Sequence, residues 1–170
     1  EGFVPRILSE QTADGMLINY QLNVPPRMVE LIDGHNIPAV WLNTRRPHDC
    51  VHPDDLGAAR MGTEHLIELG HRRIAYFDLS HRREELTTTH YSAHDRWQGY
   101  VAAMEHAGFE PVAWFRDDLT TKKWPRADYE IAEIFRRQDR PTACLSYSGG
   151  DLFTRVAVML DLQIPRDLSI

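Results

Sequence analysis

Short apolar runs alternate with longer segments of helical periodicity along most of this 170-residue chain, and this alternation limits the folds open to it. The apolar runs predict buried strands at residues 15–20, 37–42, 73–77, 112–115, 143–147 and 168–170. Helical segments separate these runs, at residues 25–34, 53–69, 92–107, 129–137 and after 149–151. Strands that alternate with helices predict a doubly wound α/β fold with mostly parallel sheets.

Residues at the ends of the helical segments support these boundaries. The pair Asp54-Asp55 is typical of a helix N-terminus, where carboxylates accept hydrogen bonds from free backbone amides. Gly34, Gly70 and Gly108 each follow an apolar periodic stretch, as a residue that ends a helix does. The segments therefore predict complete βα units rather than isolated apolar patches.

The composition excludes several classes of protein. A hydrophobic fraction of 42% with 26% charged residues predicts a folded globular chain. The formal net charge of −6 does not favour binding to nucleic acid, which normally needs an excess of Lys and Arg. Any contact with DNA would therefore come from residues outside this chain. No run approaches the roughly 20 apolar residues of a membrane span, and the N-terminal residues lack the pattern of a signal peptide, which favours the cytoplasm.

Motifs of catalysis and metal binding are missing from the sequence, and we expect neither an enzyme nor a bound cofactor. The sequence contains no GxSxG, GxxxxGK[ST] or GxGxxG pattern, and Ser148-Gly149-Gly150 is only an imperfect echo of a phosphate-binding turn. Cys50 and Cys144 are far apart and predict neither a disulfide framework nor a zinc site. His90 and His94 have the spacing of a zinc pair on a helix but no evident third ligand, so no metal is predicted.

Six segments, in order, resemble the LacI/GalR family of transcriptional regulators, which is built on the type I periplasmic-binding-protein fold. The longest is DDLGAARMGTEHLIELGHRRIAYF at residues 54–77, and its second half combines a helix end, a glycine, a basic turn and a strand. The other five lie at residues 13–19, 37–43, 95–109, 141–145 and 164–170. Together they cover nearly the whole chain from residue 13.

The resemblance implies the effector-binding and dimerisation core of a bacterial regulator. Its N-terminal lobe would occupy residues 1–70 and its C-terminal lobe residues 71–170, both as parts of a larger domain. A helix-turn-helix DNA-binding domain would lie outside this chain, and the protein would be a homodimer. A small polar metabolite, such as a sugar or sugar derivative, would bind in the cleft between the lobes and control DNA binding allosterically. The alternative is a periplasmic sugar-binding protein of a transport system.

Candidate effector contacts follow from the resemblance and from fold topology. Arg96 falls where the family places an effector-contacting arginine, and a guanidinium suits hydroxyl, carboxylate or phosphate groups. Ligands of open α/β sheets bind outside the carboxyl ends of the strands. This rule adds Asn19, Tyr20 and Asp78, which end or follow predicted strands, as candidate effector contacts. Asp55, at a helix N-terminus, and Ser148, after the strand at 143–147, are two further candidates.

Two of these positions have open alternatives. Asp55 is either an effector contact or a helix cap, and the two roles are compatible. After the strand at 143–147 the chain departs from the family pattern, since Tyr147-Ser148-Gly149-Gly150-Asp151 replaces the usual alanine, asparagine and aspartate. Either Asp151 takes the acidic position or Ser148 supplies a polar contact.

Three tryptophans also invite a sugar-stacking interpretation, because aromatic rings suit the apolar faces of pyranoses. Core packing is the favoured alternative for Trp97 and Trp114, which lie within predicted elements. Trp124 stands in the polar segment TTKKWPR and is the freer candidate.

Overall fold

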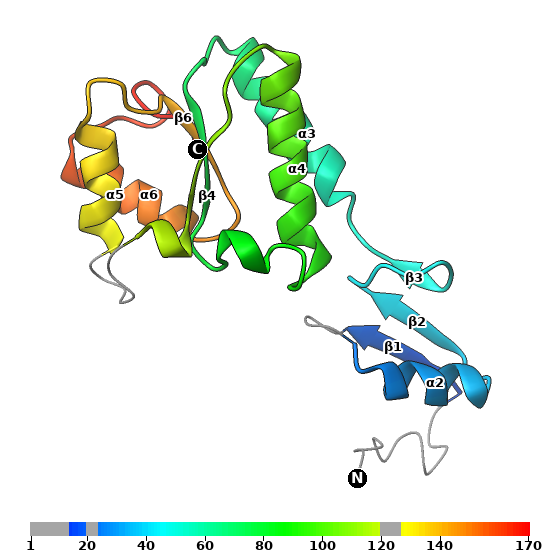
Figure 1. Ribbon diagram of the computed structural model, residues 1–170. Coiled ribbons are helices and arrows are strands. Elements are labelled where there is room, and N and C mark those ends of the chain that lie inside the picture. Colours follow the sequence, from blue (N-terminus) through cyan, green and yellow to red (C-terminus); the bar gives the residue numbers. More distant parts are fainter. Residues whose placement is uncertain (1–13, 20–23, 120–126) are drawn as a thin grey trace. The chain divides into compact units, whose positions relative to one another are not determined.

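The computed structural model describes residues 14–19, 24–119 and 127–170, and the chain divides into two compact units (Figure 1). Unit 1 comprises Glu1–Pro53 with Thr89–Tyr91, and unit 2 comprises Asp54–Thr88 with Ser92–Ile170. Each unit contains its own parallel sheet. The predicted α/β class with parallel sheets is thereby confirmed.

Unit 1 is a small three-stranded sheet with one helix beside it. Its elements are β1 (Met16–Asn19), α2 (Pro26–Gly34), β2 (Ala39–Leu42) and β3 (Cys50–Val51), and the strand order is β1-β2-β3. Ile18, Ile32 and Trp41 are buried together at its centre. The helix begins with Pro26 at its first position, where the missing amide hydrogen costs nothing.

Unit 2 contains most of the described helices and strands. Its helices are α3 (Asp55–Glu68), α4 (Tyr91–His106), α5 (Ala127–Arg136) and α6 (Gly150–Met159), with short 3₁₀ turns η1 (Arg83–Glu85) and η2 (Arg116–Asp118). Its strands are β4 (Ile74–Asp78), β5 (Val112–Phe115) and β6 (Ala143–Ser146), in the order β5-β4-β6. Ser169 adds a parallel bridge to Ala143, where a strand is predicted at 168–170.

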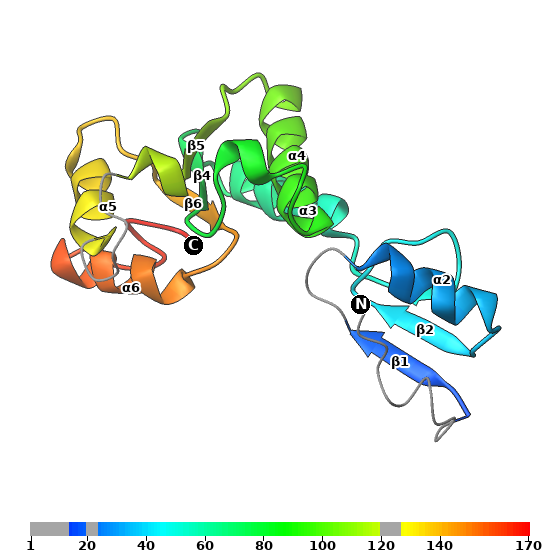
Figure 2. The ribbon, with the colours of Figure 1, turned by 60° about the horizontal axis from the view of Figure 1, so that its bottom comes forward.

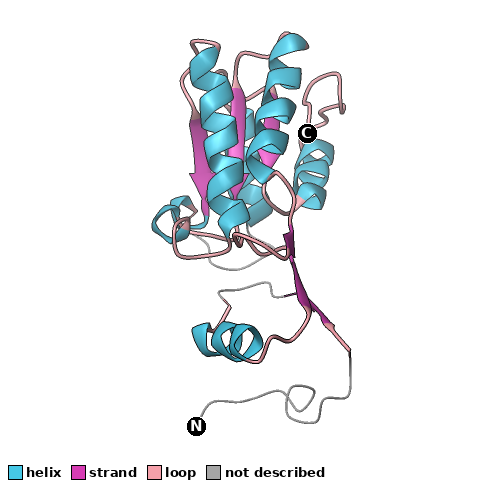
Figure 3. Ribbon diagram, turned by 90° about the vertical axis from the view of Figure 1, so that its right-hand side faces the viewer, coloured by secondary structure: helices cyan, strands magenta, loops and turns pink. Residues whose placement is uncertain are grey.

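Strand β4 is the middle strand of the unit 2 sheet, and helices cover both faces of this sheet (Figure 1). Figure 1 shows α5 and α6 on one side of β4 and α3 and α4 on the other. Figure 2 shows the same pairing of α5 with α6 from a second direction, and Figure 3 shows a helix layer in front of the strands. All five residues of β4 are buried, as expected for a strand covered on both faces.

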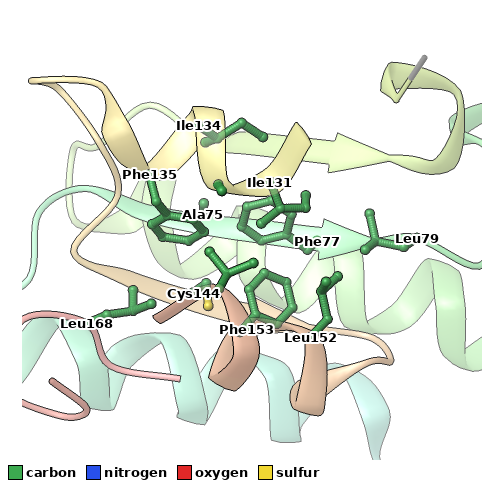
Figure 4. Packing of buried hydrophobic residues seen from close by; sticks show 12 residues of the cluster. Ala75, Phe77, Leu79, Ile131, Ile134, Phe135, Cys144, Leu152, Phe153 and Leu168 are labelled. Atoms are coloured by element: carbon green, nitrogen blue, oxygen red, sulfur yellow. The ribbon is translucent and has the colours of Figure 1, made fainter. Parts of the chain in front are cut away.

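The side chains of β4 alternate between two apolar clusters. Ala75 and Phe77 point to the α5–α6 side, where Phe77 meets the rings of Phe135 and Phe153 (Figure 4). Ile74 and Tyr76 belong to the cluster on the α3–α4 side. Strand β4 therefore packs against both helix layers, and its carboxyl end is held at a fixed position relative to α3, α4, α5 and α6.

The predicted helix ends are confirmed at α3 and α4. Asp54 caps α3, with its side chain accepting a hydrogen bond from the backbone amide of Gly57 at 2.9 Å. Gly70 and Gly108 follow α3 and α4 with φ angles of +96° and +74°. A residue with a Cβ rarely adopts this left-handed backbone, which explains why glycine stands at both positions.

Helix α3 belongs to unit 2 by its contacts, although the lobe boundary predicted from the sequence places it in residues 1–70. Its buried residues Ala59 and Leu66 lie on the side of α4 and β4. These contacts show where α3 packs, and the boundary between the two predicted lobes at residue 70 stays a prediction.

His71, in the turn after α3, connects to the residue before β6 and to the bridge residue Ser169. Its Nδ1 lies 2.9 Å from Thr142 Oγ1 and its Nε2 lies 3.0 Å from Ser169 Oγ. Burial lowers the pKa of His71 below its ordinary value of 6.5. In mildly acidic solution the unfolded chain consequently binds more protons at this residue than the folded chain does.

Stability should therefore fall as the pH drops below 6.5 toward the folded pKa of His71. We expect urea unfolding to show a larger loss between about pH 7.5 and 5.5 for the wild type than for His71→Asn, which cannot titrate. His106→Asn, a change at an exposed residue, is the control and should keep the wild-type pH dependence. Equal pH dependence in all three proteins would contradict this role for His71.

Tyr100 supplies the buried hydroxyl that connects α4 to the sheet. Its side chain is fully buried, and its hydroxyl lies 2.9 Å from Ile74 O and 3.0 Å from Val112 O. The same oxygen accepts a hydrogen bond from the Val112 amide at 2.9 Å. Burial raises the pKa of Tyr100 to about 12, so the hydroxyl stays protonated and remains a donor.

Tyr100→Phe should lower the free energy of unfolding by about 1–3 kcal/mol, because the Val112 amide loses its acceptor inside the core. Tyr129→Phe is the matched control, since Tyr129 is 64% exposed. Chemical denaturation measures both changes. A loss no larger for Tyr100→Phe than for Tyr129→Phe would show that this hydroxyl does not stabilise the fold.

Candidate functional site

Polar side chains gather at one edge of unit 2, where β4 and β6 end and α3 and α4 begin. We define the strand-end site by five residues that hydrogen bonds, ring contacts or charge effects connect to one another: Asp55, Tyr76, Ser92, Arg96 and Tyr147. Asp55 is the first residue of α3, and Arg96 lies in the second turn of α4. Tyr147 directly follows β6. This is the edge where parallel α/β sheets bind their ligands.

An ion pair between Arg96 and Asp55 is the central contact of the strand-end site. Arg96 Nε donates to Asp55 Oδ1 at 2.7 Å, and the exposed fractions of the two side chains are 41% and 4%. Burial of Arg96 opposes its charge, but the hydrogen bond and the negative charge of Asp55 raise the pKa of Arg96 above its ordinary value. Its two Nη groups have no hydrogen-bond partner within the described ranges. A charged and oriented guanidinium edge therefore stays available.

Tyr147 supports this guanidinium from one face. The Cζ atom of Arg96 lies 5.0 Å from the centre of the Tyr147 ring, within the range of a cation–π contact. The Tyr147 hydroxyl lies 3.0 Å from Ser92 Oγ, and the ring of His81 meets the Tyr147 ring edge-on at 4.9 Å. Tyr147 is thus held from both ends, and it limits the positions that Arg96 can adopt.

Tyr76 brings a buried hydroxyl without a partner into the same site. Its side chain is 1% exposed, and its hydroxyl is one of two buried side-chain polar atoms that lack a hydrogen bond in the described part of the chain. Burial, with the negative charge of Asp78, raises the pKa of Tyr76, and the positive charge of Arg96 partly opposes that change. A neutral donor therefore lies within electrostatic reach of the ion pair. Buried hydroxyls of native proteins nearly always have a partner.

Asp78 organises the turn that follows β4. It is fully buried, and its Oδ1 accepts hydrogen bonds from the backbone amides of Ser80 and His81 at 3.0 Å. Its Oδ2 lies 3.0 Å from His81 Nδ1. The turn holds Ser80 Oγ 2.7 Å from Ser148 Oγ. Asp78 thus positions neighbouring polar groups, and its own carboxylate is already occupied.

Three further residues were predicted as effector contacts: Asp151, Asn19 and Tyr20. Asp151 is exposed in the first turn of α6 and pairs with Arg155 at 2.5 Å, and that hydrogen bond holds the pKa of Asp151 below its usual range. Asn19 is an exposed residue of unit 1, at the end of β1. Tyr20 lies outside the described residues. Within unit 2, Asp151 has no described contact with the strand-end site.

Several residues of the strand-end site were not predicted. Asp54, rather than Asp55, caps α3, which leaves the Asp55 carboxylate for Arg96. Tyr147 satisfies the rule that selected Asn19 and Asp78, since it directly follows a strand, and that rule would have found it. Tyr76 and Ser92 gave no such signal, because each lies inside an apolar or helical pattern.

Trp97 and Trp114 pack in the core of unit 2, as the alternative to sugar stacking predicts. Trp97 packs with Tyr76 and Phe115, and Trp114 stacks on Phe77 at 5.1 Å between ring centres. Trp124 lies outside the described residues. No group of three or more His, Cys, Asp or Glu residues suited to a metal ion occurs among residues 14–19, 24–119 and 127–170.

Gly99 permits the close approach of α3 and α4 that creates the strand-end site. A Cβ atom at this position would lie 2.2 Å from Leu56 O and 3.0 Å from Arg60 N, both backbone atoms of α3. Such contacts force the two helices apart. Gly99 lies one turn after Arg96, and Leu56 follows Asp55 directly, so this contact controls the distance between the two charged residues.

Comparisons with known proteins agree on one family. Residues 5–170 match the family described as periplasmic binding proteins and sugar binding domain of LacI family. The arabinose metabolism transcriptional repressor of Geobacillus stearothermophilus is 33% identical over 143 residues, 79% of this chain and 37% of that protein. The HTH-type transcriptional repressor CytR of Escherichia coli (strain K12) is 30% identical over 185 residues, 99% of this chain and 48% of that protein. The chain thus spans at most about half the length of these relatives.

Solved structures show the same fold. A LacI family regulatory protein from Chloroflexus aggregans superposes with a TM-score of 0.71 at 21% identity, over 96% of this chain and 57% of that chain. A LacI family transcriptional regulator from Mycobacterium smegmatis gives a TM-score of 0.66 at 29% identity, over 97% of this chain and 59% of that chain. None of the described helices combines the length and the apolar character that a membrane crossing requires.

Gly99→Ala should destabilise unit 2 by about 1–3 kcal/mol, because the added methyl group collides with the α3 backbone. Gly62→Ala is the matched control on α3, where the nearest atom to a new Cβ is Leu145 Cδ2 at 4.0 Å. That control should stabilise the helix by roughly 0.5–1 kcal/mol, since alanine loses less backbone entropy than glycine. Denaturation curves that rank the two variants in the opposite order would refute the close-approach role of Gly99.

Proposed function

Because this chain belongs to the family of periplasmic binding proteins and sugar binding domains of LacI type, we propose that it is the effector-sensing part of a bacterial transcriptional regulator. The curated relatives that it matches are named as transcriptional repressors. A solute-binding protein of a transport system, the alternative on the same fold, is not favoured by these relatives. We accordingly place the protein in the cytoplasm.

The free guanidinium edge of Arg96 is the observation that carries this proposal. Asp55 holds the arginine through Nε and Tyr147 lies against its face, so the side chain reaches the ligand already oriented. The Tyr76 hydroxyl adds a second donor without a partner within the described chain. These donors suit the oxygen atoms of a small polar metabolite, such as a sugar or sugar derivative.

Regulation would follow from the elements that the ligand connects. Asp55 begins α3, Arg96 lies in the second turn of α4 and Tyr147 directly follows β6, so a ligand here contacts residues from two helices and from the segment after a strand. A ligand that prefers one arrangement of these elements shifts the population toward it, and a coupling of about 1–3 kcal/mol suffices for a useful switch. In the regulator that we propose, a homodimer transmits this shift to DNA-reading segments outside this chain.

A thermal-shift screen identifies the effector. Candidates are neutral sugars, sugar phosphates, nucleosides and amino acids, each tested with the 170-residue chain. A ligand present at about a hundred times its Kd adds about 2.7 kcal/mol of stability and raises the melting temperature clearly. A screen without any stabilising ligand, on a chain that melts cooperatively, would count against an effector-sensing function.

For a ligand found in this way, Arg96→Lys should weaken binding by about tenfold or more. The lysine keeps a positive charge beside Asp55 but lacks the guanidinium fork. Arg60→Lys is the matched control, because Arg60 is an exposed α3 residue that pairs with Glu64. Isothermal titration calorimetry measures all three affinities, and equal losses in both variants would remove Arg96 from the site.

Tyr76→Phe separates binding from folding in the same experiment. The lost hydroxyl has no hydrogen bond to break within the described chain, so the melting temperature without ligand should not fall. The affinity for the effector should fall, because the ligand loses a donor. Unchanged affinity would show that the Tyr76 hydroxyl plays no part in binding.

A further inference from the structure

The opposite edge of the unit 2 sheet holds a cavity of about 470 Å³, at the amino ends of β4 and β5. Ile74 and Val112, the first residues of these two strands, line it. The strand-end site lies at the carboxyl ends of the strands, and no residue of that site contributes to this cavity. The cavity is therefore a separate feature of the molecule.

Four arginines line the cavity: Arg72, Arg73, Arg137 and Arg140. Two carboxylates, Glu110 and Asp139, also line it, so its formal charge is positive although the whole chain carries −6. No described carboxylate lies within 4.0 Å of any of the four guanidinium groups. The positive charges at this cavity are not neutralised by ion pairs of the described chain.

Backbone carbonyl groups hold three of these arginines in place. Arg73 Nε donates to Arg140 O at 2.9 Å, and Arg140 Nη1 donates to Asp167 O at 3.0 Å. Arg72 Nη1 donates to His71 O at 2.9 Å, and its guanidinium lies over the ring of Phe109 at 5.2 Å. Each of these guanidinium groups keeps nitrogen atoms without a hydrogen bond to a described residue. Arginines oriented in this way lose little freedom when they bind an anion.

An apolar surface completes the cavity. Trp114 and Ile134 line it from β5 and α5, and both lie against the apolar cluster on the α5–α6 side of the sheet. One face of the Trp114 ring stacks on Phe77, and the tryptophan side chain remains only partly buried. A volume of this size is within the range of small-molecule pockets.

We propose that this cavity binds a small aromatic anion, whose charged oxygens contact the arginines and whose ring contacts Trp114 and Ile134. Arginine favours phosphate and carboxylate oxygens because its nitrogen atoms match their geometry. An inorganic anion would leave the apolar surface uncovered, and a neutral aromatic compound would leave the arginines without a counter-charge. The inference does not depend on the effector proposed for the strand-end site.

The test uses phenyl phosphate as the probe, measured by isothermal titration calorimetry on the 170-residue chain at low salt. We expect saturable binding with one site, tighter than for inorganic phosphate or benzyl alcohol, and weaker in about 0.5 M NaCl because salt screens the charges. Absence of saturable binding would overturn the proposal. So would equal affinity for inorganic phosphate, because the apolar surface would then contribute nothing.

Variants at neighbouring arginines locate the binding. Arg137→Gln should weaken binding of phenyl phosphate by about fivefold or more, and its side chain has no described contact whose loss would disturb the fold. Arg136→Gln is the matched control: Arg136 precedes it in the sequence, pairs with Glu133 and does not line the cavity. That control should bind within about twofold of the wild type.

Arg96→Lys distinguishes this cavity from the strand-end site. It should leave the affinity for phenyl phosphate unchanged. Loss of phenyl phosphate binding in Arg96→Lys, with full binding in Arg137→Gln, would overturn the inference and would support the strand-end site as an anion site instead. The reverse pattern supports the cavity at the amino ends of β4 and β5 and leaves the effector proposal to its own test.

Discussion

The close contact between α3 and α4 at Gly99 is the constraint on which the strand-end site depends. Only a residue without a side chain lets the α4 backbone lie against Leu56 O and Arg60 N. The two helices then bring Asp55 and Arg96 to 2.7 Å, although 41 residues separate them in the sequence. A buried carboxylate without such a partner would be costly, because the charge loses its water and gains nothing in return. The ion pair and the helix contact therefore stabilise the same arrangement of α3 and α4. This arrangement leaves the Nη groups of Arg96 available to a ligand.

Tyr76 and Tyr100 belong to the apolar cluster on the α3–α4 side of the sheet, and their buried hydroxyl groups differ in their partners. The Tyr100 hydroxyl is hydrogen-bonded to the backbone of both β4 and β5, so it serves the fold. The Tyr76 hydroxyl is equally buried but has no partner in the described chain, and the charges of Arg96 and Asp55 both act on its pKa. A donor that the fold itself does not use favours a role in binding. The sheet supports both roles, because β4 is fixed between two apolar layers and its carboxyl end cannot shift freely.

Most helices and strands of this chain could be predicted from its sequence, because their signals are local. Asp54, Gly70 and Gly108 mark helix ends by backbone chemistry, and apolar runs mark the buried strands. The two-residue strand β3 is too short to show any period, and it was missed. In the strand-end site, Arg96 and Asp55 were predicted as separate contacts, but their pairing depends on helix packing that no local pattern encodes. Tyr76 was hidden for the same reason, since an inward residue of an apolar strand looks like any other core residue.

The role of Arg96 is tested most directly by NMR of the arginine side-chain Nε–Hε groups during titration with the effector. The Arg96 signal should move and saturate with the same Kd as the calorimetric binding, because the ligand engages the free edge of its guanidinium. The signal of Arg60, an exposed arginine of α3, should stay in place. An effector that binds while the Arg96 signal remains unchanged would contradict a binding site at the carboxyl ends of β4 and β6.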